Sequence, residues 1–575
     1  MNQTRVFLIF AWLMVATLLW MEWGKERSAP LPATIDTTTA PTSTVPSASG
    51  APASGGVPAV PTAPASMGAT PVATTSATGI PVTVTTDVMR AVLTGGELRQ
   101  VDLLQYPSTS SADSPPVRLF DADPARYFVA QSGWVSNAGP APSHEAGFVP
   151  EITTAGTDAS APAFALADGA ASVVVPFVWT GANGVTIRRT YTFKRGDYVV
   201  DVRDEVVNAG NAPWQGFVYR QLSRVPRALV AKGPMSAESY SFQGAAWFSA
   251  TDKYERRKFD DFVDDGPLDK DVTGGWIGML QHHFFAAWIP ATGDASKFSL
   301  ATPQGATGPQ YLIREVGPGV NVAPGATAST QARLWVGPKL VKQIEAQTVP
   351  GLERAVDFSQ FTMMATIAGW LFWVLERIHG LVGNWGWAII GLVILIKAAM
   401  YPLSAAQYKS MAKMRKFQPR IAQLKERYGD DKQKFQQAMM ELYKKEKINP
   451  VGGCLPILLQ MPVFLALYWM LSESVELRHA PWIGWIQDLT ARDPYFVLPV
   501  INMAVMWATM KLSPTAPGMD PMQAKMLQMM PLVFGVMFAF FPAGLVLYWI
   551  TNSGLGLLQQ WWMTKRYSDA SATLE

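Results

Sequence analysis

The chain has 575 residues, of which only 16% are charged and 49% are hydrophobic. A soluble globular protein carries about 25% charged residues, so this composition indicates that much of the surface does not face water. The net charge of +3 is too small to indicate nucleic-acid binding. A single cysteine, Cys454, excludes an intrachain disulfide framework and any cysteine-cluster metal site. The sequence therefore predicts a membrane protein with a large water-exposed part.

The first 80 residues predict a membrane anchor followed by a flexible tether. Within residues 1–25, Val6 to Met21 form an uncharged run that is long enough to cross a bilayer. A cleavable signal peptide is the alternative, but bulky and acidic residues stand where a small-residue cleavage site would follow. Residues 26–80 are almost entirely Pro, Ala, Thr, Ser and Gly, which predicts a disordered tether.

Residues 81–345 predict one large all-β sandwich. Two strand-like runs, Val173–Trp179 and Val185–Phe193, flank Gly181–Gly184, which is typical of a hairpin turn. Further strand-like runs are Tyr198–Val207, 276–289 and 330–336. No linker-like composition interrupts the region, which favours one sandwich over two small domains.

Residues 379–566 are predicted to cross the membrane five times, with tryptophans near the ends of the apolar runs as at membrane interfaces. The five runs are Leu381–Met400, Val451–Leu471, Tyr495–Met510, Met526–Phe541 and Ala543–Trp562. With the anchor they make six spans, so the expected fold is a multi-pass α-helical membrane protein with an all-β domain. Residues 356–378, whose apolar run Phe358–Leu375 is short for a span, predict an amphipathic helix on the interface. Residues 567–575 are a short tail.

The charges of the connecting loops predict the orientation. Residues 401–450 carry twelve Lys and Arg against five Asp and Glu, whereas residues 473–494 carry two against four. The positive-inside rule therefore places 401–450 and the C-terminus in the cytoplasm, and the β domain outside the inner membrane. This assignment requires that Phe358–Leu375 is not a span.

The basic loop has an amphipathic pattern of its own at residues 403–447. Apolar residues recur at helical spacing on both sides of Tyr428–Asp431, and Pro419 is predicted to break the first stretch. Two short helices joined by a tight turn can pair antiparallel. The basic side chains suit anionic lipid, and equally a docking surface for ribosomal RNA or a targeting receptor.

Lys397, in the run Ile394–Met400, is the most informative residue of the predicted spans. An ionisable group within a span indicates function by default, but Lys397 is about one turn from the cytoplasmic end and could extend to the headgroups. Other polar residues at membrane depth are Gln460, Tyr548, Thr551, Asn552 and Ser553. Such groups suit a water-filled pocket, and equally ordinary interhelical hydrogen bonds.

No motif of a nucleotide-binding, hydrolytic or metal-dependent enzyme is present. His282 and His283 are adjacent, so on a strand they are expected to point to opposite faces and not to share a metal. We expect no enzyme activity, no metal and no cofactor.

Several motifs together resemble the Oxa-type membrane insertase superfamily in its Gram-negative bacterial form. They are Met400–Leu403, Gln407–Arg415, Asn449–Pro456, Gln460–Pro462 and Phe541–Tyr548. The resemblance implies a five-helix insertase core, a periplasmic β-supersandwich and a cytoplasmic helical hairpin. It also implies insertion of nascent membrane proteins, alone and with the Sec translocon, including SecD and SecF.

The resemblance also implies site residues. Those of a hydrophilic groove are Lys397, Gln460, Tyr548, Trp549 and Asn552, and those of the hairpin are Lys413, Arg415, Lys416, Tyr428 and Gly429. The sequence departs from the family at Lys397, where an arginine is usual, and at Trp549, where many relatives have a second tyrosine. Charge is kept at the first position, but the planar guanidinium is lost.

Three functions are weighed on this basis. An insertase would use a groove open to cytoplasm and lipid, in which Lys397 attracts acidic flanks of an incoming segment. An ion-coupled transporter would use Lys397 as a protonation site, but residues 381–471 and 495–562 show no internal repeat. An anchored carbohydrate-active protein would leave the five C-terminal spans unexplained. The insertase is favoured.

Overall fold

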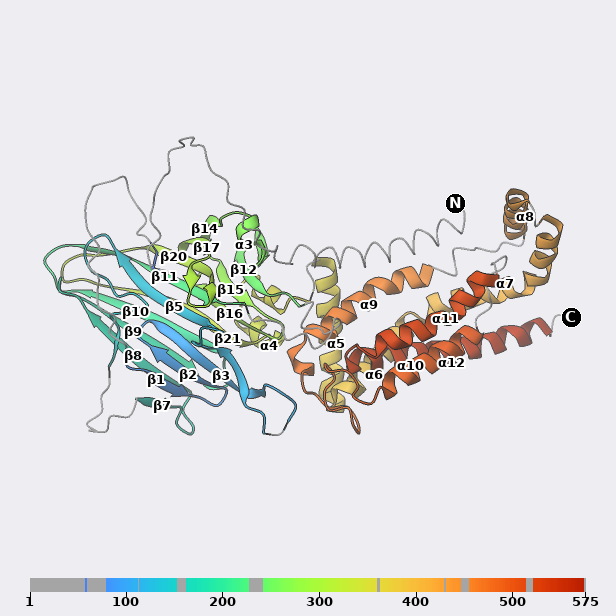
Figure 1. Ribbon diagram of the computed structural model, residues 1–575, viewed down its shortest axis with the longest axis horizontal. Helices are drawn as coiled ribbons and strands as arrows, with labels where there is room; N and C mark the ends of the chain where they lie inside the picture. The colour runs from blue at the N-terminus through green and yellow to red at the C-terminus, as the bar shows by residue number, and fades with distance from the viewer. Residues whose placement is uncertain are drawn as a thin grey trace, which may run out of the picture.

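The computed structural model describes residues 57–58, 79–111, 113–151, 162–226, 241–358, 362–428, 431–445, 455–512 and 521–572. The predicted anchor, nearly all of the tether and Gly429 lie outside these residues. Figure 1 shows the strands gathered at one end of the molecule and the long helices at the other.

The β domain is a sandwich of two large sheets. The first has ten strands in the order β14 (Asp269–Thr273), β17 (Ala295–Ala301), β20 (Tyr311–Val322), β11 (Trp214–Arg224), β5 (Phe128–Ser136), β3 (Glu97–Pro107), β2 (Met89–Thr94), β1 (Val82–Thr85) and β7 (Ala163–Ala165), with β4 (Pro116–Phe120) paired to β3. The second has nine strands in the order β13 (Lys253–Lys258), β12 (Gly244–Ser249), β15 (Trp276–Leu280), β16 (Phe284–Pro290), β21 (Thr327–Pro338), β10 (Val199–Asn208), β9 (Val185–Lys194), β8 (Ser172–Thr180) and β6 (Val149–Pro150). A two-stranded sheet pairs β18 (Gln304–Gly305) with β19 (Gly308–Pro309). The predicted sandwich is confirmed.

The predicted hairpin is also present. Strands β8 and β9 pair antiparallel with Val173 opposite Phe193, and the turn between them spans Gly181 to Gly184. Alternate residues of β9 are buried between the sheets, which is the period-two pattern of a half-buried strand. The core is rich in fully buried aromatic side chains, including Trp134, Trp276 and Trp335.

A short helix, α3 (Asp261–Asp264), lies between β13 and β14. The helix α4 (Val341–Ala346) and the 3-10 turn η1 (Leu352–Val356) connect the β domain to the helical region. The long helices are α5 (Thr362–Val382), α6 (Trp385–Ala399), α7 (Tyr401–Tyr428), α8 (Lys432–Lys445), α9 (Leu455–Glu473), α10 (Val497–Leu512), α11 (Pro521–Phe538) and α12 (Ala543–Ala572), with the 3-10 turn η3 (Val475–Leu477) after α9. In Figure 1, α5 lies across the direction of α9 and α12.

Among the described residues, no helix is both long enough and apolar enough to cross a membrane. The count of six spans stays a prediction. One local expectation is wrong: α7 continues through Pro419 without ending there. Proline removes one backbone hydrogen bond, and an exposed helix can bend to accommodate that loss.

Candidate functional site

Lys397 lies in the last turn of α6. That helix begins at Asn384, whose side-chain oxygen accepts a hydrogen bond of 3.2 Å from the backbone N–H of Trp387. The Asn384 amide also donates to the carbonyl oxygens of Pro481 and Trp482, which fixes α6 against the α9–α10 connection. Lys397 is partly buried, and none of the described residues gives it a carboxylate or a hydrogen-bond partner.

A polar pair from two other helices lies in the same part of the helical region. Nε2 of Gln460, on α9, donates to Oδ1 of Asn552, on α12, at 3.2 Å. One turn further along α12, a Cβ atom at Gly556 would stand 3.7 Å from Nζ of Lys397. A side chain at Gly556 would therefore compete for the space around the ammonium. The helices α6, α9 and α12 thus supply the predicted polar groups of Lys397, Gln460 and Asn552, respectively. Gly556 was not among the predicted site residues.

Aromatic side chains pack beside this polar pair. The ring of Phe464, on α9, is 4.9 Å from that of Trp549 and 6.2 Å from that of Tyr548. Trp549 also contacts Phe538 of α11, with ring centroids 5.4 Å apart. Its indole N–H is buried without an acceptor among the described residues. Tyr548 is almost fully buried. Both residues line the α9–α12 contact as packing groups.

Thr551 does not join the polar pair. Its hydroxyl donates to the carbonyl oxygen of Leu547 in its own helix at 2.8 Å. Asn502, which was not among the predicted site residues, is fully buried on α10, and its Oδ1 has no donor among the described residues. An asparagine inside the apolar run Tyr495–Met510 was a usable signal.

The predicted helical hairpin is built by α7 and α8. Ile421 of α7 is buried against Met439 and Tyr443 of α8, and Phe417 and Leu442 pack at the margin of this cluster. Tyr428 is partly buried at the end of α7. The side chains of Lys413, Arg415 and Lys416 lie outside the part of the chain that the structure describes.

A second polar cluster joins the β domain to the end of α9. His282 and His283 were expected to point to opposite faces, and this is wrong. They lie in the turn between β15 and β16 with their rings stacked 3.7 Å apart, and their ring nitrogens approach the carbonyl oxygens of Ser472 and Glu473. The strand ends before them, so strand alternation does not apply.

Glu473 follows the predicted span 451–471 and is buried in this junction. Its Oε2 is 3.8 Å from Nζ of Lys339, and it accepts a hydrogen bond from Ser241 at 3.2 Å. Burial raises the pKa of Glu473 and lowers the pKa of Lys339, which favours the neutral forms of both. Nearby, burial raises the pKa of Glu476 to about 7, and its Oε1 accepts from the backbone N–H of Val341. Burial therefore favours the protonated forms of both carboxylic acids in the junction.

Comparisons with known proteins cover the whole chain. Residues 377–570 match the family described as 60Kd inner membrane protein, and residues 81–374 match the YidC periplasmic domain. The chain is 59% identical to the membrane protein insertase YidC of Stenotrophomonas maltophilia (strain K279a), over 99% of this chain and 97% of that protein. It is 57% identical to the protein of the same name from Xanthomonas campestris pv. campestris (strain ATCC 33913), over 99% and 98%. A solved structure of an active YidC insertase with its first transmembrane domain resolved is 19% identical, covers 84% of this chain and 94% of that chain, and has a TM-score of 0.35.

Proposed function

The chain belongs to the YidC family of membrane protein insertases, and we propose that it works through the polar cluster of Lys397, Gln460 and Asn552. The protein is an inner membrane protein with a periplasmic β domain, and it inserts membrane proteins without acting as an enzyme. What is proposed here is the route by which a substrate passes.

The physical problem is the polar flank of the substrate. This flank must cross about 30 Å of hydrocarbon, and a charge at the centre costs at least about 2.5–3.5 kcal/mol. Lys397 has no charge partner among the described residues, and it lies about one turn of α12 from the amide pair of Gln460 and Asn552. Together these groups offer such a flank a charge partner and hydrogen-bonding groups part-way across. Acidic flanks benefit most, because the ammonium of Lys397 attracts them. No covalent bond changes.

The apolar segment of the substrate then leaves between α9 and α11. Support comes from exposed apolar side chains on both helices, including Met461 and Leu465 on α9 and Val533 and Val536 on α11. These side chains suit a surface that a hydrophobic segment touches on its way into lipid. Trp549 of α12 contacts Phe464 of α9 and Phe538 of α11, and so links the two helices.

We also propose the predicted topology of six spans, with α5 on the periplasmic interface and both termini in the cytoplasm. The loop charges support it. Single-cysteine labelling in a Cys454→Ser background should mark position 430 only from the cytoplasm and position 200 only from outside. Cytoplasmic labelling of position 200 would overturn this topology and make α5 a span.

The proposed partners are the Sec translocon with SecD and SecF on the membrane side, and the ribosome, a targeting receptor or anionic lipid at the α7–α8 hairpin. Deletion of residues 411–443 should impair insertion while the helices α9–α12 remain folded. Unchanged insertion of all tested substrates would reduce the hairpin to a connector.

Photocrosslinking tests the exit route. A photoreactive amino acid placed at Met461 or Leu465 should crosslink to a stalled nascent membrane protein. The matched control is Val500 on α10, which is apolar and similarly exposed. Equal crosslinking from α10 would contradict the proposed route. Deletion of the β domain should leave most insertion activity, whereas a carbohydrate-active protein would lose all activity.

A further inference from the structure

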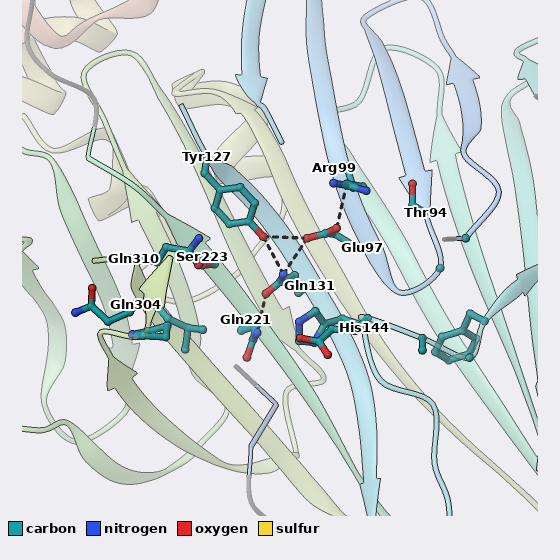
Figure 2. A pocket seen from close by; sticks show the side chains of 18 residues that line it. Thr94, Glu97, Arg99, Tyr127, Gln131, His144, Gln221, Ser223, Gln304 and Gln310 are labelled. Atoms are coloured by element: carbon teal, nitrogen blue, oxygen red, sulfur yellow. Dashed lines mark hydrogen bonds and ion pairs between the residues drawn. The ribbon is translucent and has the colours of Figure 1, made fainter. Parts of the chain in front are cut away.

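A cleft of about 390 Å³ lies on the outer face of the ten-stranded sheet. It is lined mainly by polar side chains, four of which are glutamines: Gln131, Gln221, Gln304 and Gln310. Figure 2 shows Gln304 and Gln310 on one side of the cleft, Glu97 and Arg99 on the other, and Gln131 and Gln221 between them. Membrane insertion, as proposed above, makes no use of this cleft.

The floor of the cleft is a row of four side chains on four neighbouring strands. Glu97 of β3 is opposite Gln131 of β5, Gln131 is opposite Gln221 of β11, and Gln221 is opposite Arg314 of β20. Each neighbouring pair is joined by a hydrogen bond. Arg314 donates to Oε1 of Gln221 at 2.8 Å, Gln221 donates to Oε1 of Gln131 at 2.7 Å, and Gln131 donates to Oε1 of Glu97 at 2.8 Å.

The two central side chains of this row are buried although their face of the sheet is the outer one. Gln221 is fully buried and Gln131 is 6% exposed. The Gln131 amide is used twice, because it also donates to the Tyr127 hydroxyl at 3.2 Å, and Tyr127 in turn donates to Glu97. A network with so many directed bonds holds its side chains in single orientations. The floor is therefore rigid.

The rim carries the groups that remain for a ligand. Among the described residues, neither the Gln304 amide nor Nε2 of His144 has a hydrogen-bond partner, since His144 uses Nδ1 to contact the Tyr219 hydroxyl at 2.7 Å. Burial lowers the pKa of His144 to about 4, so this ring is neutral at physiological pH. Arg99 is paired with Glu97 at 3.3 Å. The cleft thus presents amide, hydroxyl and imidazole groups with little net charge.

These features exclude other ligand classes. An extended peptide cannot join the sheet here by backbone pairing, because β3, β5, β11 and β20 are interior strands with neighbours on both sides. A phosphate or another anion would need an excess of basic groups, and there is none, because Arg99 and Arg314 are balanced by Glu97 and Glu145. Among the described residues, no cluster of ligands for a metal ion is present. What remains is a small, uncharged ligand with many hydroxyl groups.

We propose that this cleft binds a neutral saccharide of one or two sugar units. Glutamine amides suit such a ligand because each one both donates and accepts, as each sugar hydroxyl does. The volume fits a small ligand. The proposal concerns binding by the β domain and is independent of the route proposed for insertion.

Ligand-observed saturation-transfer NMR on the full chain tests the proposal. The protein is purified in a detergent without a sugar headgroup, because maltoside headgroups would compete. The probes are maltose, lactose and N,N'-diacetylchitobiose at millimolar concentration. At least one of them should show transfer, and Gln304→Ala combined with Gln310→Ala should weaken its binding about tenfold or more.

The matched control is Gln331→Ala, an exposed glutamine on β21 of the other sheet, which should bind as the parent does. Unchanged thermal unfolding of the double variant shows that the sandwich is intact. Absence of transfer from all three probes would overturn the proposal, as would equal binding by the parent and the double variant. Saturation transfer to an unfolded apolar peptide, without transfer to any saccharide, would overturn the proposal and assign the cleft to protein substrates instead.

Discussion

Arg189 of the β domain and Lys397 of the helical region are cations in opposite surroundings. In the β domain, Arg189 is fully buried. Its guanidinium donates to both carboxylate oxygens of Asp204, at 2.7 and 2.6 Å, and to the carbonyl oxygen of Ser132. Trp134 completes the cluster by donating to Asp204 at 2.7 Å. In the helical region, Lys397 is partly buried and has no such partner among the described residues.

On the mechanism proposed above, this difference separates a structural charge from a functional one. Arg189 and Asp204 pair within the nine-stranded sheet, and their hydrogen bonds with Ser132 and Trp134 join it to the ten-stranded sheet, which leaves no group of the pair for a ligand. An unpaired cation within a membrane costs free energy. The proposal is that a passing substrate supplies the partner that Lys397 lacks among the described residues. Substitution of Arg189 in the β domain should therefore lower the free energy of unfolding strongly, whereas substitution of Lys397 in the helical region should change insertion.

The largest effect is expected from breaking the pair in the β domain. Arg189→Met leaves Asp204 buried without its partner and should lower the free energy of unfolding by about 3–5 kcal/mol. Thermal unfolding of the full chain measures it. Replacing both residues, as Arg189→Met with Asp204→Leu, should recover much of the loss. An exposed pair, Lys194 with Asp201, is the control and should contribute less than about 1 kcal/mol. A stable single variant would refute the structural role of the pair.

Substitution of Lys397 should change insertion and not stability. Lys397→Glu should reduce insertion of substrates with acidic flanks by about tenfold or more, since repulsion replaces attraction. Lys397→Arg should retain function and Lys397→Ala should fall between. A complementation assay with acidic-flank and neutral-flank substrates measures this, with protein levels checked by immunoblot. If Lys397 only extends to the headgroups, all three variants insert normally, and equal insertion by Lys397→Glu and the parent would sink the mechanism.

The sequence predicted the classes of element better than their contacts. Alternation and turn residues were sufficient for the β8–β9 hairpin, because both signals are local. The spatial neighbours of Gln460 and Lys397 were not predictable. Asn552 is about 90 residues from Gln460, and Gly556 is about 160 residues from Lys397, so only the packing of α6, α9 and α12 brings each pair together. The junction at Glu473 was missed for the same reason, and the stacked histidines were misread because the strand ends before them.

The junction should respond to pH in one direction. Burial raises the pKa of Glu476 from near 4.5 to about 7, so the folded state holds its proton more firmly than the unfolded state does. The stabilisation is fully present below about pH 4.5 and is lost as the pH rises through about 7. Between pH 5 and pH 8 the parent should lose about 1–2 kcal/mol, allowing for partial exposure.

Thermal unfolding at pH 5, 6.5 and 8 measures this dependence. Glu476→Gln, which cannot ionise, should flatten it. Glu345→Gln, on the exposed side of α4, is the matched control and should leave the dependence as it is in the parent. A pH profile that Glu476→Gln does not change would assign the dependence to other groups, such as Glu473 and Lys339.

The smallest effect on stability is expected from loss of the Gln460–Asn552 hydrogen bond. The same variants distinguish a pair that only joins two helices from a pair that also hydrates a passing substrate. Interhelical hydrogen bonds in membranes contribute about 0.6 kcal/mol on average, so Gln460→Leu and Asn552→Leu should each destabilise only slightly, with coupling of that size between them. If the bond only joins α9 to α12, insertion stays normal in both variants. If the two amides also hydrate a passing flank, insertion of substrates with polar flanks should fall several-fold at unchanged protein level.

Thr551→Val is the matched control for these variants. It removes a hydrogen bond within α12 one residue from Asn552, so it alters the same helix without touching the pair. Normal insertion by Thr551→Val together with reduced insertion by both leucine variants supports the route past Lys397. Normal insertion by all three would leave Lys397 as the sole polar determinant of that route, because the amides would then do no more than pack two helices together.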